Sequence, residues 1–163
     1  MIIKIKNKDT LIIGEFKLKC CLGKKGISKN KFEGDLTTPK GKFKLGKLYW
    51  RSDRVQKPKT SLFCKKIKKN MGWCNDINSR YYNKEIKKNK KIKYEKLYRY
   101  DHKYDCFILI KYNYDSPKKN KGSAIFIHLT KNYKPTAGCI AVRKKDFFIL
   151  AKLAKTNSKI IIS

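Results

Sequence analysis

Apolar residues recur at every second position through much of this chain, and this spacing constrains the fold more than any other sequence feature. In residues 1–22, isoleucine and leucine alternate with lysine, and Asn7, Lys8 and Asp9 form a turn signal between two such runs. A two-residue period places alternate side chains on opposite faces of an extended strand. Residues 1–22 therefore predict a β-meander, and the chain as a whole predicts a mostly-β fold.

Other segments carry strand, turn or helix patterns. We expect strands at residues 43–50, 106–112, 124–129, 138–142 and 160–162. Residues 23–41 contain several glycines and Pro39 and are expected to form a loop, whereas residues 51–93 are expected to be loops with a short helix. One C-terminal helix is predicted to begin at Asp146 as its cap and to stop near Asn157, because the apolar residues between them follow helical spacing.

The length of 163 residues suits one hydrophobic core, so we expect residues 1–163 to form a single domain, and we expect a monomer. The longest apolar run, Phe147–Ala151, is far shorter than the roughly 20 residues that span a bilayer, so no transmembrane segment is predicted. Lysines interrupt every apolar stretch at the amino terminus. The sequence taken literally therefore shows no secretory signal and predicts a cytoplasmic protein.

The chain is strongly basic. It has 43 basic and 12 acidic residues, a net charge of +31, and nearly all of the basic residues are lysines. Specific nucleic-acid binding usually relies on arginine, whose planar group contacts phosphate or guanine at two points. Because the excess is lysine and is spread along the whole chain, no specific nucleic-acid partner is predicted. A charge of this size does attract anionic surfaces at low salt.

Two residues are candidates for covalent chemistry. The six cysteines show no C-x-x-C pair, so we expect mostly buried reduced thiols, no metal site and no cofactor. Cys139 differs from the rest because it follows Gly138 in a turn, and His128 ends a strand 11 residues earlier. A thiol becomes a nucleophile when an imidazole takes its proton, and amides near Gly138 and Ile140 suit a developing oxyanion. On spacing alone, a buried thiol and a hydrogen-bonded core histidine remain the simpler interpretation.

Several motifs occur in a fixed order along the chain. His128 is followed by a loop and then by Thr136-Ala-Gly-Cys139, and residues 38–43 read TPKGKF. Residues 33–35 (EGD), 72–76 (GWCND), 82–83 (YN) and 122–126 (GSAIF) accompany them. Together these segments resemble the L,D-transpeptidase catalytic domain (YkuD-like) family, in a short single-domain branch. The resemblance extends over nearly the whole chain.

The resemblance implies a β-sandwich-like fold with one C-terminal helix and few other short helices, and a cysteine acyltransferase of the cell envelope or periplasm. Cys139 would be the nucleophile, His128 its base and Gly138 part of the oxyanion site, with a backbone carbonyl orienting the imidazole. The thiolate would attack a peptidoglycan stem tetrapeptide as donor, release D-Ala, and pass the acyl group to an amine acceptor in a 3→3 crosslink. With water as acceptor, the same site would be an L,D-carboxypeptidase.

Further residues are expected at the substrate site by the same resemblance. Thr136 and Ile140 belong to the catalytic motif, and Arg143 is the nearest replacement for a family arginine at the position of Ala141. A different class of function, a non-catalytic basic module that binds anionic polymer, is the alternative to an enzyme.

Three residues outside this motif complete the expected site. Glu33 and Asp35 are expected to position the acceptor amine, and Trp73 is expected to line the cleft. Each has a structural alternative, because acidic residues in glycine-rich loops often form turns and a tryptophan in a short loop often fills a core.

Overall fold

The computed structural model describes residues 1–163 as fourteen strands and one helix. The elements are β1 (Ile2–Lys6), β2 (Thr10–Ile13), β3 (Phe16–Cys21), β4 (Ile27–Ser28), β5 (Thr38–Pro39), β6 (Gly41–Trp50), β7 (Cys64–Lys66), β8 (Met71–Cys74), β9 (Glu85–Lys87), β10 (Tyr94–Lys96), β11 (Cys106–Ile110), β12 (Phe126–Leu129), β13 (Ile140–Val142), α1 (Lys144–Leu153) and β14 (Lys159–Ile162). None of the helical segments has the length and apolarity that crossing a bilayer requires.

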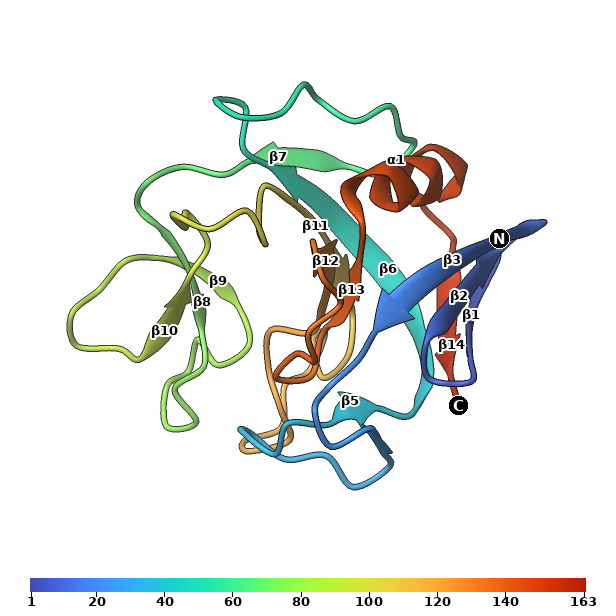
Figure 1. The fold of residues 1–163 in the computed structure, drawn as a ribbon. Coiled ribbons are helices and arrows are strands. Elements are labelled where there is room, and N and C mark those ends of the chain that lie inside the picture. Colours follow the sequence, from blue (N-terminus) through green and yellow to red (C-terminus); the bar gives the residue numbers. More distant parts are fainter.

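The largest sheet closes into a barrel-like ring (Figure 1). Its strands neighbour one another in the order β11, β12, β13, β3, β2, β1, β14, β6 and β7, and β6 also pairs with β11, so that all but β7 form the ring. The length of β6 permits this closure, because residues 41–44 pair with β14 and residues 45–50 pair with β11. Closure leaves few unpaired strand edges. The mostly-β fold and the predicted meander of residues 1–22, which forms β1 to β3, are confirmed.

On one side of the ring, the strands are buried on their inner face and on their outer face. The inner cluster takes residues from all eight ring strands and from α1, and an outer cluster forms on the opposite face of β6, β11 and β12. Strand β11 serves both clusters, with Ile108 and Ile110 inside and Phe107 and Leu109 outside. Alternation of side chains along a strand produces this division. The apolar outer face needs a second layer to cover it.

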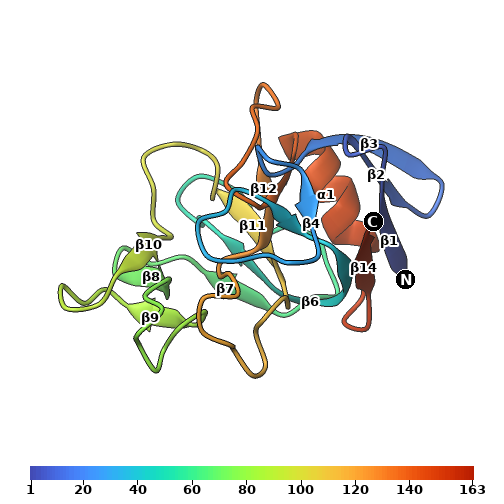
Figure 2. The ribbon, with the colours of Figure 1, turned by 90° about the horizontal axis from the view of Figure 1, so that it is seen from below.

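A smaller sheet of three strands, β10-β8-β9, supplies that layer. In Figures 1 and 2 it stands to one side of the ring, far from the two termini. Trp73 of β8 is fully buried and packs edge to face on Phe126, with ring centroids 5.1 Å apart. The prediction of a short helix within residues 51–93 is wrong, because this region forms β7, β8 and β9 joined by turns. The few other short helices expected are also not found, since α1 is the one helix of the structure. β7 pairs with β6 of the large sheet, and β8 pairs with β9 in the small sheet. Local sequence does not show these pairings, which decide the strands.

Helix α1 packs its apolar face into the inner cluster through Phe147, Leu150 and Ala151. It begins at Lys144, with Arg143 as the N-cap residue, so the prediction of Asp146 as the cap is wrong. Asp146 lies in the first turn, where a negative charge is stabilised by the helix dipole. The predicted loop at residues 23–41 is also corrected, because β4 and β5 form a short parallel pair there.

Candidate active site

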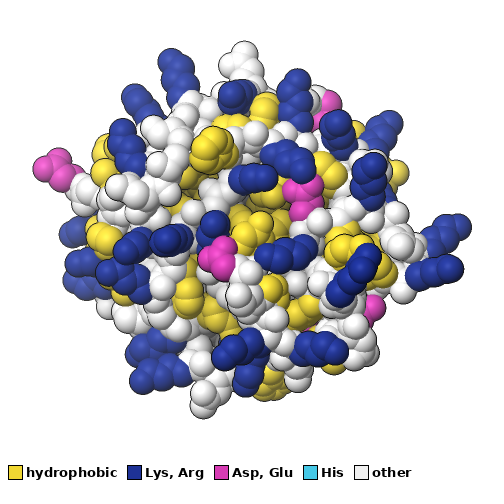
Figure 3. All heavy atoms as spheres, turned by 180° about the vertical axis from the view of Figure 1, so that it is seen from behind, with side chains coloured by type: hydrophobic (Ala, Val, Ile, Leu, Met, Phe, Trp, Pro, Cys, Tyr) yellow, Lys and Arg dark blue, Asp and Glu magenta, His cyan; other side chains and the backbone are white.

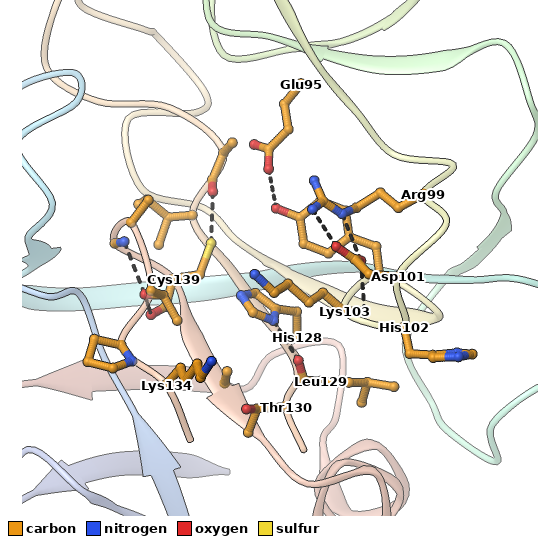
Figure 4. Close-up of a pocket in the computed structure, with 18 of the residues that line it drawn as sticks. Glu95, Arg99, Asp101, His102, Lys103, His128, Leu129, Thr130, Lys134 and Cys139 are labelled. Atoms are coloured by element: carbon orange, nitrogen blue, oxygen red, sulfur yellow. Dashed lines mark hydrogen bonds and ion pairs between the residues drawn. The ribbon is translucent and has the colours of Figure 1, made fainter. Parts of the chain in front are cut away.

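A cavity of about 930 Å³ lies between the ends of β12 and β13 and residues 99–105, which precede β11. Cys139 and His128 both line it, and Figure 4 shows the sulfur and the imidazole in the same pocket. Their exposed fractions are only 9% and 6%. Ligand sites in proteins commonly have volumes of roughly 300–1,000 Å³, so the cavity is large enough for a peptide segment.

Strand register explains why these two side chains meet. β12 and β13 run parallel, with Ile127 opposite Ile140 and His128 opposite Ala141. Cys139 therefore comes next to Phe126, whose N–H donates to the Cys139 Sγ at 3.3 Å. Because inner and outer positions alternate, the cysteine and the histidine share the outer face of the ring. The predicted side-by-side arrangement of the two strand ends is confirmed.

Burial controls the protonation of both groups. Removal from water raises the pKa of the Cys139 thiol to about 12 and lowers the pKa of His128 to about 4. The His128 Nδ1 lies 3.0 Å from the Leu129 carbonyl oxygen, which fixes Nδ1 as the N–H donor and leaves Nε2 as the base. The thiol itself donates to the Ala124 carbonyl at 3.1 Å. At neutral pH the pair is therefore a neutral thiol and a neutral imidazole, without a preformed thiolate.

The turn before Cys139 is shaped by Thr136 and Gly138. The Thr136 hydroxyl accepts the Gly138 N–H at 3.1 Å and donates to the Cys139 carbonyl at 2.6 Å. Gly138 has φ +146°, and a Cβ there would lie 2.7 Å from the Thr37 carbonyl oxygen, so only glycine fits. Gly138 was expected to be part of the oxyanion site. Its N–H is already bonded to the Thr136 hydroxyl, so this amide is not free to stabilise an oxyanion. The Cys139 N–H donates to no other group of the protein.

Two of the motif residues expected at the substrate site lie outside the cavity. Ile140 is fully buried in the inner cluster, because the alternation that turns Cys139 outward turns its neighbour inward. Arg143 caps α1 at the surface, where its guanidinium lies 5.2 Å from the Tyr133 ring centroid. Neither side chain lines the wall of the cavity.

Of the three residues expected from the upstream motifs, two lie outside the cavity and one lines it. Trp73 is a core residue whose indole N–H donates to Asn83 at 2.9 Å. Asp35 is buried in an ion pair with Lys31 at 2.7 Å and accepts the Phe32 N–H, so it organises its own loop. These two side chains do not line the cavity, whereas Glu33 does.

Several cavity residues were not predicted from the sequence. Glu95 of β10 accepts a hydrogen bond from Tyr104 at 2.5 Å, and the Tyr104 ring packs on His128 with centroids 5.4 Å apart. Lys103 points into the pocket beside His128 in Figure 4. Buried Lys31 lines the wall near Gly138. Except for Lys31, which lies beside the EGD motif, these residues belong to segments without a readable pattern, and only the fold brings them to the site.

The surface charge has no single centre on the face seen in Figure 3. Lysine and arginine side chains are scattered over this face between apolar and neutral groups. A nucleic-acid interface usually gathers its basic residues on one face or stripe. On this face, the lysine and arginine side chains form no such stripe.

Comparison with solved structures supports the fold. The helical cell shape determining protein Pgp2 (K307A mutant) from Campylobacter jejuni is similar, with a TM-score of 0.52 and 16% sequence identity. The likeness covers 99% of this chain and 46% of the Pgp2 chain, so this chain spans less than half of that protein. At this identity the likeness concerns the fold alone.

The sequence comparison gives the family. No curated protein matches this chain significantly. Residues 3–162, however, match the family described as the L,D-transpeptidase catalytic domain, or YkuD. That match covers almost every residue, including the strands that carry Cys139 and His128, and the chain therefore belongs to the YkuD family of L,D-transpeptidase catalytic domains.

Proposed function

We propose that this protein is a Cys139/His128 acyltransferase that acts on peptidoglycan stem peptides. Its family supports peptidoglycan as the substrate class. The observation that carries the catalytic proposal is the shared cavity, in which the Cys139 thiol lies in the same pocket as an imidazole with a free Nε2. Because the family acts on peptidoglycan, the proposed place of action is the cell envelope.

The first half-reaction follows from the neutral state of the pair. His128 Nε2 takes the thiol proton as the sulfur attacks the carbonyl carbon before the terminal D-Ala. The Cys139 N–H stabilises the oxyanion, since this amide has no other partner in the protein. The C–N bond then breaks, and the imidazolium gives its proton to the D-Ala nitrogen. The products are free D-Ala and a Cys139 thioester.

We propose Lys103 as the group that holds the D-Ala carboxylate. The resemblance places an arginine at position 141, where this chain has Ala141, and the expected replacement Arg143 is outside the cavity. Ala141 lines the cavity opposite His128, and its small side chain leaves room for a substrate group. Lys103 points into the pocket beside His128 from the segment before β11 (Figure 4), and its backbone carbonyl accepts the Leu129 N–H at 3.0 Å. An ammonium group there suits a carboxylate.

The test measures products by mass spectrometry after incubation with a stem tetrapeptide, with and without an amine acceptor. We expect release of D-Ala and a thioester adduct on the wild-type protein, and neither on Cys139→Ser. Cys64→Ser is the matched control, because Cys64 is a partly exposed thiol outside the cavity, and it should behave as wild type.

The outcomes separate the candidate functions. A crosslinked product identifies the transpeptidase, and a shortened tripeptide without crosslink identifies the L,D-carboxypeptidase. If wild type and Cys139→Ser are equally inactive and equally folded, the enzymatic proposal is refuted and a basic binding module remains.

A further inference from the structure

The turn that carries Cys139 offers one free backbone amide for an oxyanion. The Gly138 N–H is bonded to the Thr136 hydroxyl at 3.1 Å, whereas the Cys139 N–H donates to no other group of the protein. Sites that stabilise the tetrahedral intermediate of acyl transfer usually combine more than one preorganised donor. A second donor is therefore expected from another part of the cavity wall.

Lys31 places an ammonium group at this wall. Its side chain is only 4% exposed and lines the same cavity as Cys139. Its Nζ donates to the Asp35 carboxylate at 2.7 Å and to the Thr37 carbonyl oxygen at 2.8 Å. Because an ammonium group has three N–H donors, one of them is left without an acceptor in the protein. A buried donor without a partner is costly, and such a group in a cavity wall is available to a bound molecule.

Two glycines leave the space that this lysine occupies. A Cβ at Gly138 would lie 3.3 Å from Lys31 Nζ, and a Cβ at Gly122 would lie 2.8 Å from Lys31 Cε. Both glycines also have positive φ, +146° and +99°, which other residues rarely adopt. Since Gly138 is bonded directly to Cys139, the ammonium lies beside the peptide unit that carries the free Cys139 N–H.

The Asp35 carboxylate holds this ammonium in place. Asp35 also accepts the Phe32 N–H at 2.9 Å, the Thr37 N–H at 2.9 Å and the Thr37 hydroxyl at 2.7 Å. Burial opposes this negative charge, but the hydrogen bonds from Lys31, Thr37 and Phe32 outweigh burial and lower the pKa of the carboxyl. A buried ion pair is tolerated when the remaining polar positions of both groups are satisfied. The carboxylate has these partners, whereas the ammonium has one N–H left for a substrate.

We propose that the Lys31 ammonium is the second oxyanion donor of the acyl-transfer site. The inference rests on the acyltransferase function above and adds a catalytic side chain to it. As the Cys139 sulfur bonds to the substrate carbonyl carbon, the π electron pair of C=O moves onto oxygen. The negative oxygen accepts hydrogen bonds from the Cys139 N–H and from Lys31, and the pair re-forms the carbonyl when the C–N bond breaks. Lys31 keeps its three protons throughout, so it stabilises charge without acting as an acid.

The two lysines of the cavity wall then have different roles. Lys103 is proposed to hold the D-Ala carboxylate, which is charged before the reaction begins, so this contact contributes to substrate binding. The oxyanion exists only while the C–S bond forms and the C–N bond breaks. Lys31 should therefore contribute to the rate of acylation and little to the affinity for the substrate.

The experiment measures acylation of Cys139 by p-nitrophenyl acetate from the burst of released p-nitrophenol. Attack on this ester forms the same kind of oxyanion, and it requires neither a peptidoglycan site nor a proton on the leaving group. The rate that Cys139→Ser retains is subtracted as background. We expect Lys31→Met, which keeps the aliphatic stem, to lower the Cys139-dependent rate about 100-fold or more. Lys29→Met removes the same charge from an exposed position outside the cavity and should keep the wild-type rate.

Two further measurements separate this role from a structural one. Alkylation of Cys139 by iodoacetamide forms no oxyanion, so its rate in Lys31→Met should change by less than about 10-fold. Asp35→Asn removes the partner charge but keeps the ammonium, and it should lose less than about 10-fold in ester acylation. The double variant Lys31→Met/Asp35→Asn leaves no buried charge unpaired and should be as slow as Lys31→Met. It provides the same test if the single variant does not fold.

The outcomes distinguish the oxyanion role from the proposed substrate. Equal losses in acylation and alkylation, or an ester acylation rate within about 10-fold of wild type in the folded variants, refute the role of Lys31. Calorimetry on Cys139→Ser should give the same tetrapeptide affinity with and without Lys31→Met, and a loss of affinity as large as the loss of rate also refutes it. If ester acylation depends on Lys31 but the wild-type protein forms no thioester with the tetrapeptide, the oxyanion role is retained and the peptidoglycan substrate is refuted.

Discussion

Acidification should destabilise this protein through His128 in a way that can be calculated. Burial lowers the pKa of His128 from 6.5 to about 4, whereas the unfolded chain keeps the ordinary value. Below pH 6.5 the unfolded state therefore binds a proton that the folded state refuses, and stability is lost as the pH falls from 6.5 to about 4. Each pKa unit corresponds to about 1.4 kcal/mol, so the loss from this residue is about 3 kcal/mol.

Urea denaturation at pH 7 and pH 4 measures this loss. Other groups contribute, because Asp35 and Asp101 have lowered pKa values and also lose stability in acid. The control is His128→Asn, which removes the titrating ring and keeps a donor near the Leu129 carbonyl. The fall in unfolding free energy between the two pH values should be about 3 kcal/mol smaller in His128→Asn than in wild type. Equal falls would refute the argument that His128 is held neutral, and with it the assignment of Nε2 as a free base at neutral pH.

Two further predictions concern the nucleophile and its turn. Without substrate, alkylation of Cys139 by iodoacetamide should keep rising with pH beyond pH 9, because burial raises its pKa to about 12; a plateau below pH 8 would show a preformed thiolate instead. Gly138→Ala should lower the unfolding free energy by about 3 kcal/mol and Tm by about 10 °C, because its Cβ meets the Thr37 carbonyl oxygen at 2.7 Å and its φ is +146°. Gly26→Ala, with φ +81° and open space around it, should cost about 1 kcal/mol, and equal losses in calorimetry would contradict the steric explanation.

The two candidate catalytic residues could be identified from the sequence because their placement depends on local pattern. Alternation in β12 and the turn before β13 put His128 and Cys139 on one face, and the ordered motifs around them indicated the family. The residues of the substrate site were harder to predict from the sequence. Ile140 and Trp73 are apolar residues within the motifs, and a linear motif does not show which side of a closed sheet each side chain faces.

Sequence alone determined the strand-rich architecture, the C-terminal helix and the pair formed by Cys139 and His128, since a two-residue or helical period acts over only a few neighbouring residues. Tertiary structure decided the rest. Closure of β6 onto β11 and the packing of the β8–β10 sheet brought Glu95 into the cavity, and burial there set the protonation of the thiol and the imidazole. Such contacts join segments far apart in the chain, and the loss of water that shifts a pKa depends on all of them together.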